Sequence, residues 1–214
     1  TLKHNVICLD LDQKKINNLQ RGVIHIYEPH LENNLRHCLN NNQLKFTSDY
    51  ENIKNSRIIF IAVGTPALLN GSTNLQFIYD AIDNIVKYSN TNALIVIKST
   101  VPPGTCNEIG EYLRNKGLLF QIASNPEFLR EGTAWFDFLQ PDRIVLGVTD
   151  TIALQTLNEI YTPLVRENNI PIVVTTPNTA ELIKYVSNAF LANKIAFINE
   201  MSDLCEVVNG DIYQ

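Results

Sequence analysis

The stretch Ser124-Asn125-Pro126-Glu127-Phe128-Leu129-Arg130-Glu131-Gly132-Thr133-Ala134 decides how the rest of this sequence is interpreted. It follows an apolar run over residues 118–123, which is typical of a strand. Asn-Pro then marks a turn, because proline moves the preceding residue out of the helical region. Open α/β sheets bind their ligands at such strand ends, so two carboxylates and an arginine here indicate a possible site. On a helical turn, Glu127 and Glu131 would share one face. The alternative, which the spacing alone favours, is a solvated turn with an Arg130 ion pair.

Strand-like and helix-like runs alternate along the rest of the chain. Buried strands are expected at residues 5–9, 44–47, 57–63, 93–98, 143–148 and 170–175, and helices between them, including 75–88 and 105–117. This alternation predicts an α/β fold, a Rossmann-like doubly wound parallel sheet. A long helix without internal glycine or proline is expected from Thr179 to about Val208. We therefore expect a first domain at residues 1–176, followed by a central helix and the start of a second domain at 177–214.

Composition limits the kinds of protein that this chain can be. Its 214 residues, 45% of them hydrophobic, suffice for one α/β domain and part of another. The net charge of −5 argues against a nucleic-acid surface, and no apolar run of ~18 residues suggests a membrane span. The four cysteines lie far apart without a CxxC pair, which predicts reduced thiols, no metal site and a cytoplasmic protein: Cys8, Cys38, Cys106 and Cys205.

Three strand ends carry candidate cofactor contacts. Asp10 follows the first strand, where dinucleotide-binding folds place an acid on the adenosine ribose, although a loop acid before a helix is an equal alternative. Gly64-Thr65-Pro66 follows the strand at 57–63, and its glycine permits close approach by a ligand. Ser99-Thr100 follows the strand at 93–98, where helix capping is the more common role.

Two polar residues of the long helix form a further candidate pair. Lys184 and Asn188 are four residues apart and therefore lie on one helix face. By spacing alone, an exposed lysine beside a polar neighbour is the favoured interpretation.

Several motifs together resemble the nucleotide-sugar dehydrogenases, the UDP-glucose/GDP-mannose dehydrogenase family. The resemblance covers nearly the whole chain and rests on residues 124–147, 10–16, 63–66 and 181–192. It implies NAD as the cofactor and oxidation of a UDP-sugar, UDP-glucose to UDP-glucuronate, by two successive hydride transfers. A cysteine thiohemiacetal and then a thioester lie between these transfers. The alternatives are a GDP-mannose or UDP-N-acetylmannosamine dehydrogenase, another NAD-dependent 3-hydroxyacid dehydrogenase, or a non-catalytic remnant.

The resemblance also implies roles for individual residues. Glu127, with Thr100 holding a water, would do acid/base work, while Lys184 and Asn188 would stabilise an oxyanion. The cofactor would contact Asp10, Lys15, Gly64, Thr65, Pro66, Ser99, Thr100 and Glu131. The substrate would contact Glu127, Phe128, Leu129, Arg130, Glu131, Lys184 and Asn188. The long helix would join two subunits into a homodimer.

The sequence departs from the family pattern in its loops. His25 and His30 stand where the pattern has Pro and Gly, and both are expected on the surface. Asn70 and Asn74 replace two acids; the turn is expected to survive, because Asn also tolerates turn conformations.

The family's Gly-x-Gly turn and its Cys-x-Pro-Lys-Asp segment do not occur in this sequence. None of the four cysteines is therefore expected to be the nucleophile. We expect a fragment in which the strands around Val6 and Ile59 flank a gap left by a missing central strand. Alone it would show no dehydrogenase activity, weak NAD binding and a tendency to aggregate. The alternative is that a neighbouring segment fills the gap and leaves a stable domain.

Overall fold

Strands and helices alternate along residues 4–90 and 92–212, the part of the chain that the computed structural model describes. The expected α/β alternation is confirmed. The elements are β1 (Val6–Leu9), α1 (Gln13–Gln20), α2 (Leu31–Asn40), β2 (Leu44–Thr47), the 3₁₀ helix η1 (Tyr50–Ile53), β3 (Ile58–Ile61), α3 (Gln76–Tyr88), β4 (Leu94–Ile97), α4 (Thr105–Asn115), β5 (Gln121–Ser124), α5 (Ala134–Leu139), β6 (Ile144–Gly147), α6 (Thr151–Asn168), β7 (Ile172–Thr175) and α7 (Pro177–Val207).

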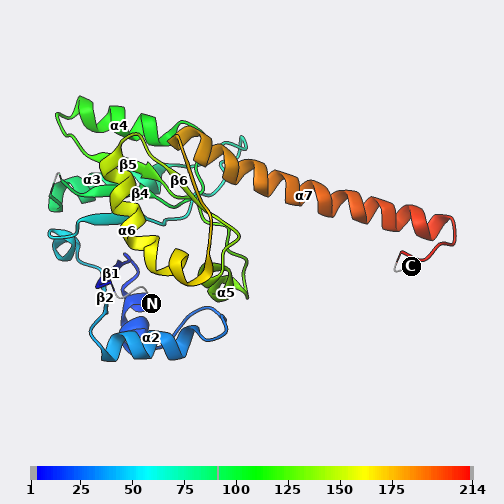
Figure 1. Ribbon diagram of the computed structural model, residues 1–214, viewed down its shortest axis with the longest axis horizontal. Coiled ribbons are helices and arrows are strands. Elements are labelled where there is room, and N and C mark those ends of the chain that lie inside the picture. The colour runs from blue at the N-terminus through cyan, green and yellow to red at the C-terminus, as the bar shows by residue number, and fades with distance from the viewer. Residues whose placement is uncertain (1–3, 91, 213–214) are drawn as a thin grey trace.

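The main sheet has the strand order β3-β4-β5-β6-β7. The strand β4, which lies between β3 and β5, is apolar at every position and buried on both faces. Ile95 and Ile97 pack into a core with α3 and α4, whereas Leu94 and Val96 pack into a second core with α6. Because successive side chains of a strand point to opposite faces, this division shows that helices cover both sides of the sheet. That is the doubly wound arrangement (Figure 1).

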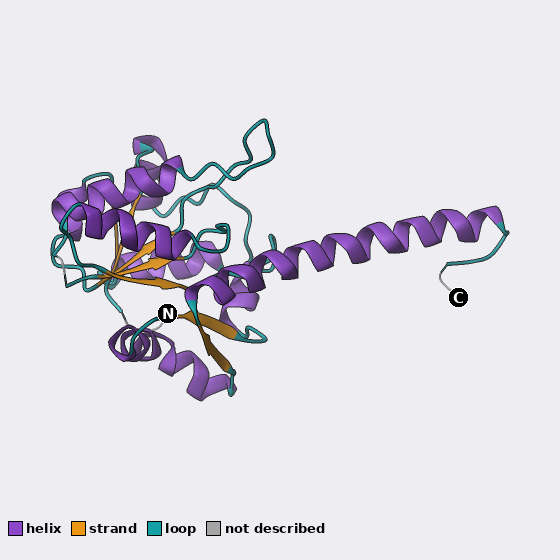
Figure 2. Cartoon of the chain, turned by 90° about the horizontal axis from the view of Figure 1, so that it is seen from above, coloured by secondary structure: helices purple, strands orange, loops and turns teal. Residues whose placement is uncertain are grey.

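A second, two-stranded parallel sheet is formed by β1 and β2. It packs with α1 and α2 around a small core of Ile16, Leu35 and Phe46. The strands around Val6 and Ile59 belong to different sheets, as expected, and Figure 2 shows the two sheets apart.

The expectation of an all-parallel sheet was wrong at one place. β3, β4 and β5 are parallel, and so are β6 and β7, but β5 meets β6 in antiparallel orientation through Ser124 and Gly147. The physical reason lies in the connection between them. α5 has only six residues and spans about 9 Å, which is too short to carry the chain back along the sheet as a crossover helix does.

Helix α7 is 31 residues long and projects from the body of the molecule (Figure 1). It begins at Pro177, two residues before the expected Thr179, because proline suits the first helical position and Thr176 caps the helix. Its first turns pack tightly on β6, where a Cβ on Gly147 would lie 2.7 Å from that of Ala180. None of the helices in the described residues is long and apolar enough to cross a membrane.

Candidate active site

A cleft of about 550 Å³ opens beyond the ends of β4 and β5. It is lined by segment 125–130, by Lys98 and by residues 137–144 and α6. Segment 125–130 is irregular and a turn begins at Glu131, so Glu127 and Glu131 do not share a helix face as they would on a helical turn. The reason is Pro126, which disfavours helical geometry at Asn125. The cleft lies at strand ends, the place where open α/β sheets bind their ligands.

Glu127 and Lys184, which are 57 residues apart in sequence, form an ion pair in this region. The Lys184 Nζ donates to Glu127 Oε1 at 3.3 Å. The lysine side chain is 9% exposed and the glutamate 33%, so the lysine is almost enclosed while the carboxylate still reaches solvent. Glu127 Oε2 accepts a bond from the Leu129 amide at 2.6 Å, which fixes the orientation of the carboxylate. The interpretation of Lys184 as an exposed surface residue was wrong.

Phe128 lies beneath two cations. The Arg143 guanidinium is 4.9 Å from the centre of the ring, and Lys184 Nζ is 5.3 Å from it. The aromatic face attracts both cations, of which Arg143 lines the cleft and Lys184 is also paired with Glu127. Anionic groups of a ligand could therefore bind here.

Lys98 is a site residue that the sequence analysis counted only as the end of a strand. It lines the cleft directly after β4. Burial lowers the pKa of Lys98 to about 8; Glu127 opposes this shift and Lys184 adds to it. The sequence did contain a signal for Lys98. A charged residue directly after a fully buried strand lies where the strand leaves the sheet, and there its side chain can reach a cleft.

The start of segment 125–130 is fixed by a buried hydrogen-bond network. Tyr161 Oη on α6 donates to Asn125 Oδ1 at 2.5 Å, and Asn125 Nδ2 donates to the Val145 carbonyl of β6 at 2.9 Å. Burial raises the pKa of Tyr161 to about 12, although the bond to Asn125 acts against it. The Tyr161 phenol is therefore protonated, and it holds Asn125, which lies two residues before Glu127.

Glu181 is a second residue that the sequence analysis missed. It is 2% exposed on α7, one turn before Lys184. Its two oxygens accept from the backbone amides of Gly104 at 2.7 Å and Cys106 at 2.8 Å, at the start of α4. The carboxylate thus satisfies two unpaired amides of that helix and ties α7 to the loop that carries Thr100.

The loops after β3 and β4 are bonded to each other. Thr65 Oγ1 donates to the Thr100 carbonyl at 2.7 Å, and Ser99 Oγ donates to the Val63 carbonyl at 2.7 Å. The structure therefore brings together two of the predicted cofactor segments. A Cβ added to Gly64 would meet no atom within 4 Å, so the space beside this backbone is open.

The loop that carries the two replaced acids keeps its turns, as expected. Asn70 Oδ1 accepts from the Ser72 amide at 3.0 Å, and Asn74 Oδ1 accepts from the Gln76 amide at 2.9 Å. Both asparagines therefore do the local hydrogen bonding that an aspartate would do.

Asp10 and Lys15, two of the predicted cofactor contacts, form an ion pair after β1. Lys15 Nζ donates to Asp10 Oδ2 at 2.5 Å, and the Asp12 amide donates to Oδ1 at 3.0 Å. Partial burial acts to raise the pKa of Asp10, but these bonds outweigh it and lower the pKa. The pair belongs to the β1–β2 sheet and is separate from the Glu127–Lys184 pair.

Arg130 forms the ion pair that the sequence offered as the simpler interpretation. Its guanidinium binds both oxygens of Asp137, at 2.7 and 3.1 Å. Hydrogen bonds from Arg130 hold the pKa of Asp137 at about 2. Leu129, Glu131 and Asn188 are exposed, Asn188 one helical turn beyond Lys184.

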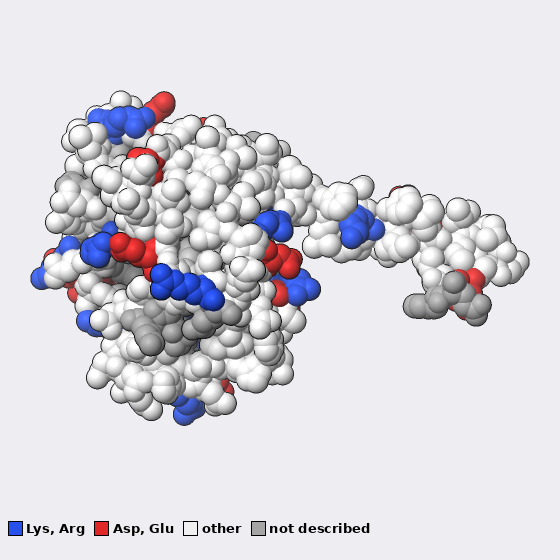
Figure 3. All heavy atoms as spheres, in the orientation of Figure 1, with Lys and Arg blue, Asp and Glu red and all other residues white. Residues whose placement is uncertain are grey.

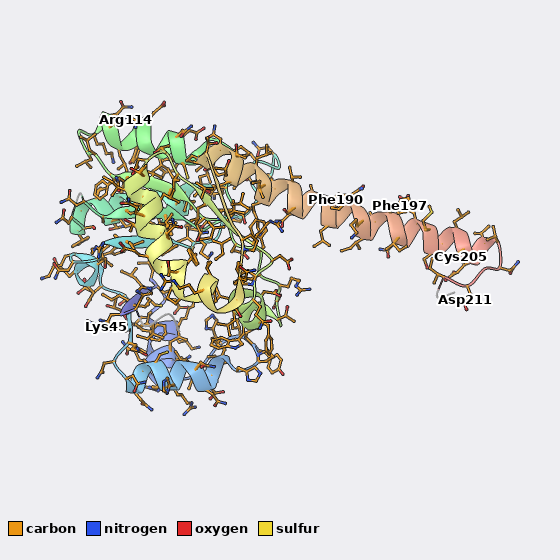
Figure 4. The ribbon with its side chains drawn as sticks, in the orientation of Figure 1. Lys45, Arg114, Phe190, Phe197, Cys205 and Asp211 are labelled. Carbon is orange, nitrogen blue, oxygen red and sulfur yellow. The ribbon has the colours of Figure 1, made fainter. Side chains whose placement is uncertain are left out.

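The four cysteines carry free thiols. Burial raises the pKa of Cys8 and of Cys106, which disfavours the thiolate that a nucleophile requires. Cys205 lies on the projecting part of α7 (Figure 4).

Residues 1–165 match the NAD binding domain of the UDP-glucose/GDP-mannose dehydrogenase family, and residues 178–214 match its central domain. The chain is 53% identical over 99% of its length to the UDP-glucose 6-dehydrogenase of Rickettsia prowazekii, and covers 49% of that protein. It is 44% identical over 98% of its length to UDP-glucose 6-dehydrogenase YwqF of Bacillus subtilis, and covers 48% of it.

Solved structures agree with these matches. A UDP-glucose dehydrogenase from Pyrobaculum islandicum superposes with a TM-score of 0.91 at 39% identity, over 98% of this chain and 49% of that one. A GDP-mannose dehydrogenase from Pseudomonas aeruginosa superposes with a TM-score of 0.90 at 33% identity, over 98% and 50%. The chain spans about half the length of the relatives it matches. It belongs to the UDP-glucose/GDP-mannose dehydrogenase family.

Proposed function

We propose that this chain carries the NAD side and part of the catalytic site of an enzyme that oxidises UDP-glucose to UDP-glucuronate. The observation that carries the proposal is the enclosed Lys184 held beside Glu127 near the cleft. Residues 1–176 form the cofactor domain, and residues 177–214 form the central helix that leads into a second domain. The UDP-glucose 6-dehydrogenases among the relatives favour this substrate over GDP-mannose or UDP-N-acetylmannosamine.

The residues present fit a dinucleotide. Asp10 is ionised and about one-third exposed, so it can accept bonds from ribose hydroxyls while Lys15 provides a cation beside it. Gly64, Thr65 and Pro66, with Ser99 and Thr100, border the open backbone after β3 and β4. NAD, when bound, supplies the hydride acceptor for each oxidation step.

The chain's own residues divide the remaining work. The Lys184 ammonium, nearly enclosed and therefore weakly screened, stabilises negative charge that develops on the sugar oxygen. Glu127, which stays partly exposed, exchanges protons with substrate or with a water held by Thr100. Asn188 adds an amide donor one turn along α7, and Glu131 lies between cofactor and sugar. Phe128, Leu129 and Arg130 contact the sugar nucleotide, with Arg143 beside them.

We also propose that α7 joins two subunits of a cytoplasmic homodimer. Beyond residue 184 the helix exposes large apolar side chains, including Phe190 at 63% and Phe197 at 58%. Figure 3 shows few charged side chains along this part of the helix on the face in view, and Figure 4 shows Phe190 and Phe197 on its projecting part. Exposed apolar surface of this extent on a protruding helix is typical of an interface.

The test is a substrate panel for the protein at its natural length. NADH formation is measured with UDP-glucose, GDP-mannose, UDP-N-acetylmannosamine and a 3-hydroxyacid, each with NAD⁺. The proposal expects the highest kcat/KM for UDP-glucose and two NADH per sugar oxidised. Preference for another sugar nucleotide would show that UDP-glucose is the wrong substrate assignment. Turnover of the 3-hydroxyacid alone would contradict the proposal. Absence of any turnover would favour the non-catalytic alternative.

A further inference from the structure

Glu28 is a buried carboxylate for which the proposed mechanism has no use. It lies in the loop between α1 and α2 and is 7% exposed. Its Oε2 accepts from the Gly132 amide at 3.1 Å, and its Oε1 accepts from the Trp135 amide at 2.9 Å. Both donors lie more than 100 residues away in sequence, in the segment that follows Glu131. A single side chain therefore joins the loop after α1 to the signature segment, residues 124–134.

A second contact joins the same two segments. The His30 ring meets the Phe136 ring edge-on, with centroids 5.4 Å apart and planes at 88°. His30 occupies the left-handed region with φ at 67°, a conformation that non-glycine residues rarely adopt. The ring contact and the two carboxylate bonds together form a clasp, residues 28–30 on residues 132–136.

The clasp completes the anchoring of the signature segment. Segment 125–130 is fixed at its start by Tyr161 and at its end by Asp137, which accepts from the Arg130 amide at 2.9 Å. The following turn contains Gly132 in the left-handed region, with φ at 81°. Glu28 also holds that turn, by bonds to a charged acceptor, which are about twice as strong as neutral ones.

We propose that Glu28 is a positioning residue that sets the placement of Glu127 and Glu131 relative to the cofactor-binding unit. The loop of Glu28 follows α1, which begins beside Asp10, so the clasp connects the adenosine side of the proposed site with its catalytic carboxylates. The inference rests on the proposed function. Misplacing such a segment by about 1 Å costs up to 100-fold in rate, because the reacting groups lose their alignment.

The experiment compares Glu28→Gln with Glu32→Gln in the protein at its natural length. Glutamine keeps the shape of Glu28 but offers one acceptor in place of two. Glu32 is a matched control, because it is an exposed carboxylate on α2 that pairs with Arg36. We expect Glu28→Gln to lower kcat about 10- to 100-fold while the Kd for NAD⁺ stays within twofold. Glu32→Gln leaves both unchanged.

A second readout does not depend on turnover. The protein is labelled with 5-fluorotryptophan, and the Trp135 signal is assigned by its loss in Trp135→Phe. Because the Trp135 amide binds Glu28, Glu28→Gln shifts or broadens the ¹⁹F resonance of Trp135, whereas Glu32→Gln does not. An unshifted resonance overturns the inference, and so does a kcat within twofold of wild type. If the wild-type protein turns over no sugar nucleotide, the proposed function fails, and the Trp135 resonance alone decides whether Glu28 positions the segment.

Discussion

Replacing Glu181 with glutamine removes one of the two bonds by which its carboxylate ties α7 to α4. In the wild-type protein the carboxylate accepts from two backbone amides, at 2.7 and 2.8 Å, and is 2% exposed. Glutamine can accept one of these bonds, and its NH₂ group then faces the other amide. Losing a bond to a charged group costs about 1.5–3 kcal/mol, and a buried donor left unpaired costs about 1–3 kcal/mol. Because these two costs overlap, we expect a loss of about 3 kcal/mol in the free energy of unfolding.

The assay is urea unfolding followed by far-UV circular dichroism, supported by thermal unfolding. For a chain of this length, ~3 kcal/mol corresponds to a fall of about 6–12 °C in Tm. Glu111→Gln is the control, because it makes the same change at an exposed position of α4, where we expect an effect within about 0.5 kcal/mol. If Glu181→Gln unfolds as the control does, the two bonds do not hold α7 in place, and our account of its anchoring is wrong.

Three further predictions concern single groups. Because the 2′-phosphate of NADP⁺ would meet the Asp10 carboxylate, the enzyme should have a higher kcat/KM with NAD⁺ than with NADP⁺; equal values would refute this. Arg130→Gln should raise the pKa of Asp137 from about 2 toward 3.8 in an NMR titration. In the wild type, this ion pair stabilises the fold above pH 3.8, and that stability is lost as the pH falls toward 2; the variant should not show this loss. Tyr161→Phe should cost about 1–2 kcal/mol of stability in urea, because Asn125 loses its buried donor; no change would contradict the network.

The sequence was most informative where a physical pattern repeats along the chain. The apolar run at residues 93–98 predicted a buried strand, and the structure places separate cores on the two sides of β4. The antiparallel approach of β6 could not be predicted in this way. It depends on the short span of α5, and a six-residue helix leaves almost no periodic signal.

The site was predictable as a set of segments but not as a set of contacts. The motifs shared with the family singled out Glu127 and Lys184. Spacing alone favoured a surface position for Lys184, because the spacing of residues does not show which of them are buried. Glu28 and Glu181 were missed for the same reason. Each is a single acid whose partners are backbone amides 75 or more residues away, and backbone amides have no sequence signature.

The central claim is that Lys184, held beside Glu127, stabilises charge in the transition state of sugar-nucleotide oxidation. The most direct measurement is the steady-state kinetics of Lys184→Ala with UDP-glucose and NAD⁺, in the protein at its natural length. Lys54→Ala, an exposed lysine directly after η1, is the matched control. The account predicts that Lys184→Ala lowers kcat about 100- to 1,000-fold and changes the KM for UDP-glucose far less, while Lys54→Ala leaves both unchanged. An unchanged kcat in Lys184→Ala would contradict it.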